Sequence, residues 1–178
     1  MIGWVFFVVP SLMCAQGTLD KVFEKYAGQE RFTTVNVSKE MFQMFGQMIE
    51  QKDTSMTELK EVMNLLTGLK VITYTIDASD YAKAVSIYNE FTGLYPAKDY
   101  KELLTVNEGR ENFRFLTKQD ASGKISEMVM LGKGKDEVMV LSLTGIIDLS
   151  KIQCLSRGIG VKGMEGLKKI KEHHHDND

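Results

Sequence analysis

Hydrophobic residues along this chain recur either at the helical spacing i, i+3, i+4, i+7 or at every second position, and these two patterns predict which segments are helices and which are strands. Residues 19–26 have the i, i+3, i+4, i+7 apolar spacing of a short amphipathic helix. The alternating, β-branched run FTTVNV at 32–37 predicts a strand. Ser38 can then cap a helix over residues 39–51. A second helix is expected to start after residues 53–55 and to run to about Leu66, closed by Gly68.

The rest of the pattern predicts one more helix and a series of strands. The clearest strand is the alternating run LKVITYTI at 69–76. Asp77 and Asp80 are expected to cap a helix that runs to about Tyr95 and is stopped by Pro96. Four short β-type runs follow, separated by turn-forming segments of hairpin length, at 100–106, 112–117, 124–131 and 137–143. These four runs predict an antiparallel meander.

Helices are also expected at residues 148–156 and 164–171. Strands and helices are partly segregated along the chain, which predicts an α+β fold. We expect a mainly antiparallel sheet of five to six strands, with the meander at its C-terminal end and helices packed on it. No linker is long enough to divide the chain, so we expect one domain at residues 16–171 and a disordered polar tail at 172–178.

The first residues of the chain have the pattern of an export signal. Residues 1–15 carry no charge and are almost wholly apolar, over a length that is shorter than the ~20 residues of a transmembrane helix. We therefore expect a signal peptide that is cleaved after Ala15, and a protein exported to the periplasm or the cell envelope. No Lys or Arg stands near Met1, so a buried N-terminal strand or helix stays open as an alternative.

Cys14 allows a further alternative, which is a lipid-modified cysteine that anchors the protein to the membrane. Met13 stands where that modification requires a small residue, so the membrane is expected as a partner only if Cys14 is modified after all.

The composition limits the chemistry of the folded body. The chain has 178 residues and a net charge of −2, which excludes nucleic acid as its main partner because phosphate binding needs a surplus of Lys and Arg. After the leader the only cysteine is Cys154, which is expected to be a small buried hydrophobe. All three histidines stand in the tail, at 173–175. A Ser-His-Asp triad, a Cys-His pair and a zinc site of Cys and His are therefore excluded from residues 16–171.

Three short motifs resemble ligand sites and are better explained otherwise. The tail histidines His173, His174 and His175 could bind a transition metal, but such tracts are usually solvated tails or cloning remnants. The GxGxxG run at 158–163 follows no predicted strand, so it is expected to be a connection rather than a dinucleotide site. The GKGK run at 132–135 lacks the ending of a phosphate loop and lies in a predicted hairpin. We predict no cofactor and no metal site.

The carboxylates that could take part in catalysis also have structural explanations. Asp77 and Asp80 flank a strand end and are expected to cap a helix. Glu127 alternates with Ile125 and Val129, so it is expected to share their face and to need a buried partner, with Arg114 and Lys124 as the candidates. A catalytic acid at Glu127 would lack a visible second group.

The methionines cluster on one predicted helix. Met41, Phe42, Phe45 and Met48 share one face of it, with Met44 close by. Such a stripe is most often core, because its spacing is that of an amphipathic helix. It is also the candidate interaction face of the protein, since Met side chains adapt to many partners. A copper(I) site is less favoured, because the neighbouring Phe residues indicate packing.

Six segments of the chain together form a recognisable ordered series. They are TTVNVSKEM at 33–41, GLKVI at 68–72, YKELLTV at 100–106, KISEMV at 124–129, LTGIIDL at 143–149 and Gly166-Leu167. In this order they resemble the domain-of-unknown-function 4252 family of small exported envelope proteins from Bacteroides-like bacteria. The resemblance covers about residues 18–171. It implies export and a single small domain, and it brings no activity, substrate or catalytic residue with it.

The sequence thus favours a non-enzymatic envelope protein that binds another protein or a surface component. The alternatives are a cell-envelope hydrolase that uses carboxylate, Tyr or Lys groups, and a carrier of a small apolar ligand. The hydrolase would show a concave pocket with at least two convergent titratable groups. The carrier would show a dry cavity under the sheet.

Overall fold

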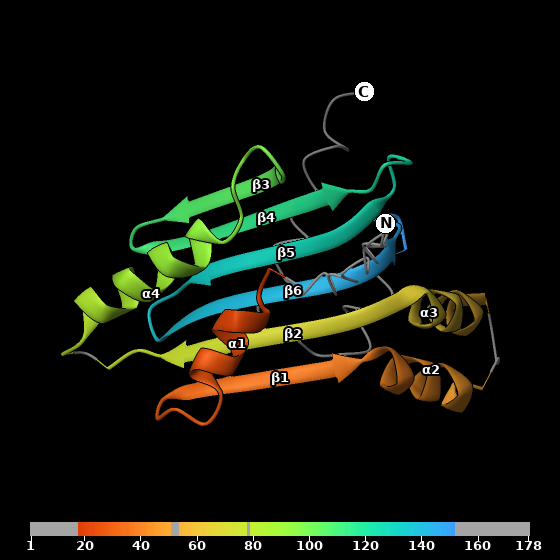
Figure 1. Ribbon diagram of the computed structural model, residues 1–178, viewed down its shortest axis with the longest axis horizontal. Coiled ribbons are helices and arrows are strands. Elements are labelled where there is room, and N and C mark those ends of the chain that lie inside the picture. The colour runs from red at the N-terminus through yellow and green to blue at the C-terminus, as the bar shows by residue number, and fades with distance from the viewer. Residues whose placement is uncertain (1–17, 51–53, 78, 152–178) are drawn as a thin grey trace, which may run out of the picture.

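Six antiparallel strands form one sheet in the order β1-β2-β6-β5-β4-β3, as Figure 1 shows for the computed structural model. The structure describes residues 18–50, 54–77 and 79–151. Its strands are β1 (Phe32–Ser38), β2 (Leu66–Thr75), β3 (Lys101–Glu108), β4 (Glu111–Gln119), β5 (Ile125–Lys133) and β6 (Glu137–Ile147). Its helices are α1 (Asp20–Tyr26), α2 (Lys39–Met48), α3 (Thr54–Leu65) and α4 (Tyr81–Gly93). The α+β fold and the meander β3-β4-β5-β6 are confirmed.

The helices are distributed unequally over the sheet. In Figure 1, α1 and α4 cross in front of the strands, so we call this side the front face. The front-face core joins these two helices to alternate residues of β2, β4, β5 and β6, and its wholly buried members include Ile72, Tyr74, Phe91, Val129 and Val140. The helices α2 and α3 lie together at one end of the sheet, beside the ends of β1 and β2. A second core, on the back face, joins them to residues such as Phe115, Met130 and Leu141.

An aromatic cluster fixes α1 and α4 on the front face. The ring of Tyr26 stacks on Phe32 at 4.0 Å and meets the edge of Phe91 at 6.0 Å. Phe32 lies 4.9 Å from Tyr74, measured between ring centroids. Each such side chain contributes roughly 1.5–3 kcal/mol when it is fully buried. The cluster therefore holds α1, the edge strand β1 and α4 in one packed unit.

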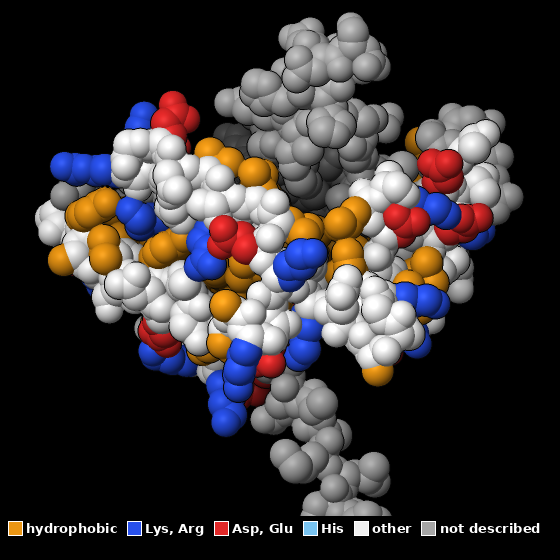
Figure 2. Space-filling view, turned by 90° about the horizontal axis from the view of Figure 1, so that it is seen from above, with side chains coloured by type: hydrophobic (Ala, Val, Ile, Leu, Met, Phe, Trp, Pro, Cys, Tyr) orange, Lys and Arg blue, Asp and Glu red, His pale blue; other side chains and the backbone are white. Residues whose placement is uncertain are grey.

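The edges of the sheet are β1 and β3. Figure 2 views the molecule from above, over the β3 edge, and shows Lys, Arg, Asp and Glu side chains interspersed with hydrophobic ones. The two edge strands differ in sequence, because β3 contains Lys101, Glu102 and Glu108 whereas β1 has no charged residue.

The structure corrects the expected end of the second helix. Gly68 does not close α3, which ends at Leu65 and continues directly into β2 at Leu66. Gly68 lies inside the sheet, opposite Ser38 of β1 and Thr144 of β6. Pairing on both sides therefore overrides the ordinary role of glycine as a helix terminator. The predicted cap at Ser38 is confirmed, since its hydroxyl accepts a bond from the Met41 N–H at 3.4 Å.

The expected segments at both ends of the chain lie outside the described residues. This holds for the signal peptide, Cys14 and most of the helix predicted at 148–156, whose described residues 148–151 form a turn. It also holds for the helix predicted at 164–171 and the tail at 172–178. Within the described ranges, no helix is long and apolar enough to cross a membrane.

Candidate binding site

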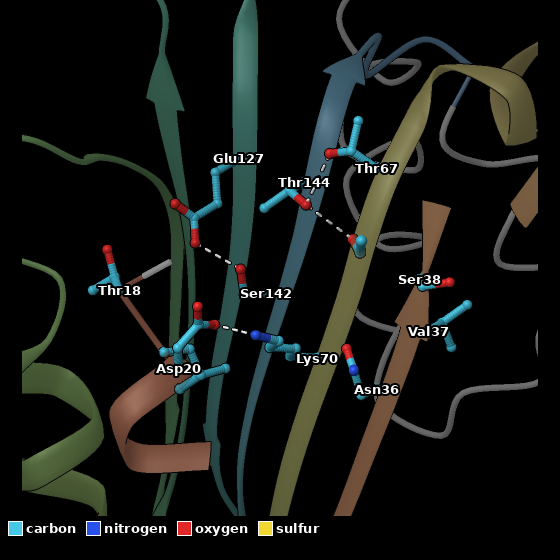
Figure 3. A pocket seen from close by; sticks show the side chains of 12 residues that line it. Thr18, Asp20, Asn36, Val37, Ser38, Thr67, Lys70, Glu127, Ser142 and Thr144 are labelled. Atoms are coloured by element: carbon cyan, nitrogen blue, oxygen red, sulfur yellow. Dashed lines mark hydrogen bonds and ion pairs between the residues drawn. The ribbon is translucent and has the colours of Figure 1, made fainter. Parts of the chain in front are cut away.

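A polar pocket of about 410 Å³ opens on the front face, beside the start of α1. Its size is within the roughly 300–1,000 Å³ of typical small-molecule sites. Four strands form its floor and α1 forms one wall, as Figure 3 shows. The lining residues are Thr18, Leu19, Asp20, Asn36, Val37, Ser38, Thr67, Gly68, Lys70, Glu127, Ser142 and Thr144.

The floor exists because the front face changes from apolar to polar along the strands. The cross-strand row Thr34, Ile72, Val140 and Leu131 belongs mostly to the aromatic side of the core. The next two rows away from α4 are Asn36, Lys70, Ser142 and Val129, and then Ser38, Gly68, Thr144 and Glu127. Opposed residues in antiparallel strands lie on the same face, so six polar side chains gather in these two rows.

Gly68 gives the floor its depth. A Cβ atom at this position would stand 3.0 Å from the Thr144 Oγ1 atom, which is closer than nearly all real contacts. The Thr144 hydroxyl donates to the Gly68 carbonyl at 3.2 Å and is bonded to the Thr67 hydroxyl at 3.1 Å. The pocket therefore has a hydroxyl chain along one side and bare backbone at its base.

An ion pair between Lys70 and Asp20 connects the floor to the wall. Lys70 rises from β2 and Asp20 begins α1, and both side chains are about a quarter exposed. The Lys70 ammonium also lies 5.7 Å from the centre of the Phe23 ring, within the distance of a cation–π contact. This pair holds the start of α1 against the sheet.

Glu127 is held from both sides by hydroxyl groups. Its Oε1 atom accepts a bond from Ser142 at 2.6 Å, and its Oε2 atom accepts one from the Tyr100 hydroxyl at 2.7 Å. The Tyr100 oxygen also lies 3.2 Å from the Thr18 hydroxyl, at the pocket rim. Burial raises the pKa of Tyr100 far above its usual value, and the neighbouring Glu127 carboxylate raises it further. Tyr100 is thus a neutral donor at physiological pH.

The expected surroundings of Glu127 were partly wrong. Its partners are hydroxyls, because Arg114 pairs with Glu102 at 2.7 Å and Lys124 is exposed in a turn. A bulge between Ile125 and Glu127 places Ile125 against the back-face core, while Glu127 stays on the front face with Val129.

Asp77 and Asp80 lie away from the pocket. Both contact the Arg31 guanidinium, at 3.1 Å and 4.0 Å. Asp80 occupies the N-cap position of α4 but makes no side-chain cap, because its carboxylate accepts a bond from the Tyr74 hydroxyl at 3.1 Å instead. The pKa of Asp77 is lowered chiefly by hydrogen bonds from Ser79, with Arg31 adding to the effect.

The methionine stripe of α2 is divided between core and surface. Phe42 is only 2% exposed and packs in the back-face core. Met41, Phe45 and Met48 are exposed, as is Met44, and Met48 is 71% exposed. The spacing 41, 44, 45 and 48 is that of one helix face. The α2 stripe, as we call these four residues, therefore lies on the surface, and Phe42 does not belong to it.

The described residues among the remaining candidates do not line this pocket. The GKGK run at 132–135 forms the end of β5 and a hairpin turn, where the Gly134 N–H bonds the Glu137 carbonyl at 2.8 Å. Cys154, the run at 158–163 and the three histidines lie outside the described residues. Among the residues that the structure places, no three His, Cys, Asp or Glu side chains come together as a metal site.

Sequence reasoning did not find most of the pocket. Lys70, Ser142 and Thr144 are polar positions within strands that are otherwise apolar on the same face, and that interruption was a usable signal. Tyr100 and Thr18 carried no such signal, because their contacts with Glu127 and with each other join segments far apart in the chain.

Comparison of the sequence with known proteins gives one match, to a family model. The family model described as "Domain of unknown function (DUF4252)" matches residues 26–155. No curated protein and no solved structure matches the chain.

Proposed function

The chain belongs to the DUF4252 family, and because a domain of unknown function brings no activity with it, we propose a function from the residues themselves. The protein is an exported component of the cell envelope that binds a small, hydroxyl-rich ligand, such as a saccharide unit, without catalysing its conversion. The observation that carries this proposal is the polar pocket beside α1. Export is supported by the apolar, uncharged pattern of residues 1–15.

The chemistry of the lining fits a ligand with many hydroxyl groups. Asp20, Glu127 and Asn36 offer acceptor oxygens, and each carboxylate oxygen can accept more than one hydrogen bond. Lys70 and the threonine and serine hydroxyls offer donors. A sugar presents alternating donors and acceptors of this kind. An apolar ligand would instead displace water from these groups without replacing its hydrogen bonds, at a cost of about 1–3 kcal/mol for each bond that is lost.

A hydrolase is the second candidate, because titratable groups do converge here. Asp20, Lys70 and Glu127 all line the pocket. Binding is favoured over hydrolysis because each of these groups already has a partner within the protein. A general acid or a nucleophile must reach the substrate, and both oxygens of Glu127 are engaged by hydroxyl donors.

The proposal is tested by titrating isotope-labelled protein with N-acetylglucosamine, galactose and diacetylchitobiose and following the backbone amide resonances. We expect saturable shifts at the pocket residues, centred on Gly68 and Thr144. The Thr144→Val variant should bind at least tenfold more weakly, because it removes a hydroxyl from the pocket floor and with it the bonds to Gly68 and Thr67 that order this side of the pocket. Thr73→Val is the matched control, since Thr73 lies on the other face of β2 and should leave binding unchanged.

The same samples separate the two candidate functions. Release of monosaccharide from diacetylchitobiose in the presence of the protein, abolished by Glu127→Gln, would establish a hydrolase. Absence of shifts with all three sugars would refute the saccharide assignment.

The α2 stripe is also a candidate contact surface for an envelope protein, and it shares Met41, Phe45 and Met48 with the interaction face predicted from the sequence. Its four exposed side chains are unbranched methionines and one aromatic ring, which adapt well to a partner. Met44→Asp should weaken such a complex, whereas Lys98→Asp, on a residue between α4 and β3, should not.

A further inference from the structure

Within the part of the chain that the structure describes, the edge strand β1 carries none of the charges, prolines or bulges that commonly protect a sheet edge. Edge strands are usually blunted by charges, prolines or bulges, because their free N–H and C=O groups attract other strands. β3 has such devices, with three charged residues and a register shift between Glu102 and Leu104. β1 consists of FTTVNVS, which has no charge and no proline and pairs with β2 without a register shift. One edge of the sheet, β3, is thus protected against pairing with another strand, and the other edge, β1, is not.

The free backbone groups of β1 can be assigned from its pairing with β2. The Thr75 N–H donates to the Arg31 carbonyl at 3.0 Å, so Arg31 faces β2. Antiparallel pairing alternates, and therefore Thr33, Val35 and Val37 face β2, whereas Thr34 and Asn36 direct their N–H and C=O groups away from it. In Figure 1, no described element lies beyond this edge.

We propose that β1 pairs in antiparallel fashion with β1 of a second copy of this chain, around a two-fold axis at Val35. This register gives complete overlap of the seven-residue strand. Thr34 of each copy then exchanges two N–H···O bonds with Asn36 of the other copy. The two six-stranded sheets become one continuous sheet of twelve strands. The proposal does not rest on the proposed ligand, although Asn36 and Ser38 belong both to β1 and to the lining of the pocket.

The side chains of β1 match a copy of themselves. On the back face, Val35 meets Val35 and Thr33 meets Val37, which are β-branched pairs of the kind that stabilise strand pairing. On the front face, Thr34 meets Asn36, and no charge stands within the strand. A two-fold interface must be self-complementary in this way. A charged peptide from another protein would find no counter-charge along β1, so the second copy is the occupant that fits.

A charged residue in place of one valine of β1 tests the proposal, and the same substitution in the other edge strand, β3, is the matched control. Val35 is 42% exposed and Val106 of β3 is 40% exposed, so a lysine fits equally well at either position. Strand pairing alone buries less than the roughly 1,200 Å² of a stable interface, so we expect a micromolar dimer. Sedimentation equilibrium of the purified chain should therefore cover about 1 µM to about 1 mM. Val35→Lys should weaken the dimer at least tenfold, and Val106→Lys should not.

Two further measurements separate pairing from a general loss of stability. A mixture of Val35→Lys and Val35→Glu should form a heterodimer that neither variant forms alone, because opposite charges then face each other. In a Val35→Cys variant whose native cysteines are replaced by serine, the two thiols should form an intermolecular disulfide when a mild oxidant is added, since Cα atoms of non-hydrogen-bonded pairs lie about 4.5 Å apart. Val106→Cys should not crosslink. A wild-type chain that is monomeric throughout, equal effects of lysine at both edges, or a mixture without rescue would each overturn the proposal.

Discussion

The pair Tyr95 and Tyr100 allows a sharp test of how the front-face core is stabilised. Their rings meet edge to face at 5.0 Å, and their exposures are 4% and 5%. Their hydroxyls differ, because Tyr100 donates to Glu127 at 2.7 Å whereas the buried Tyr95 hydroxyl has no hydrogen-bond partner among the described residues. The two Tyr→Phe changes remove the same atom from the two members of one contact.

The expected magnitudes follow from these environments. Hydrogen bonds to charged groups contribute about 1.5–3 kcal/mol, and water can replace part of this one because Glu127 is only half-buried. Tyr100→Phe should therefore lower the free energy of unfolding by about 1.5–2 kcal/mol. Tyr95→Phe removes a buried group that makes no hydrogen bond, so the free energy of unfolding should stay the same or rise by up to about 1 kcal/mol.

Urea unfolding of both variants measures the difference, with the m-value as the control. The midpoints should move in opposite directions, or only Tyr100→Phe should move, while m stays constant. In thermal unfolding, a difference of 1.5 kcal/mol corresponds to about 3–6 °C in a chain of this size. Equal losses in the two variants would refute the reasoning, because they would show that ring packing and not hydroxyl pairing controls both sites.

Three further predictions concern the core, the backbone and pH. Phe91→Ala should lower the free energy of unfolding by about 3–5 kcal/mol, as measured by urea, because its side chain is wholly buried. Gly145→Ala should lower the free energy of unfolding by more than Gly109→Ala. Both glycines have a positive φ, but a Cβ atom at Gly145 would lie 2.4 Å from the Leu65 carbonyl oxygen, whereas no atom lies within 4 Å of one at Gly109. Above about pH 10, stability should fall by up to about 1.4 kcal/mol per pH unit for each protected tyrosine, because the unfolded chain ionises while Tyr95 and Tyr100, whose pKa values are raised by burial, keep their protons. The tyrosinate absorbance of Tyr95 and Tyr100, taken as the difference between the wild-type chain and the Tyr95→Phe and Tyr100→Phe variants, should then appear together with unfolding, and its appearance before unfolding would contradict the assignment.

The elements of the fold could be predicted because their signals are local. The alternation in β2 and the turn segments after Pro96 identified the strands, and the Ser38 cap located the start of α2. Gly68 was misinterpreted because glycine after a helix is usually a terminator, and only the pairing with β6 shows that it lies within a strand. The bulge between Ile125 and Glu127 places the Ile125 side chain on the back face, whereas regular alternation would put it on the front face with Glu127. Nothing in the sequence distinguishes this bulge from regular alternation.

The pocket could not be predicted in the same way. Its lining comes from α1, β1, β2, β5 and β6, and its polar rows exist only once the strand order is known. Lys70 gave a partial signal inside an apolar run. The partner of Glu127 was sought among cations, since a buried carboxylate usually needs one, but two neutral hydroxyls serve it here.

The direct passage from α3 into β2 has a mechanical consequence. No residue stands between Leu65, the end of the helix, and Leu66, the start of the strand, and the Leu65 carbonyl lies tightly against Gly145 of β6. Only Leu66 and Thr67 stand between the helix end and Gly68 at the base of the pocket, and the register irregularity between Leu66 and Gly68 is the one place in this connection that can absorb a rotation of α3. Any molecule that binds α2 and α3 more tightly in one position of Gly68 than in another must change the affinity of the pocket for its ligand, and the ligand must change the affinity for that molecule by the same factor.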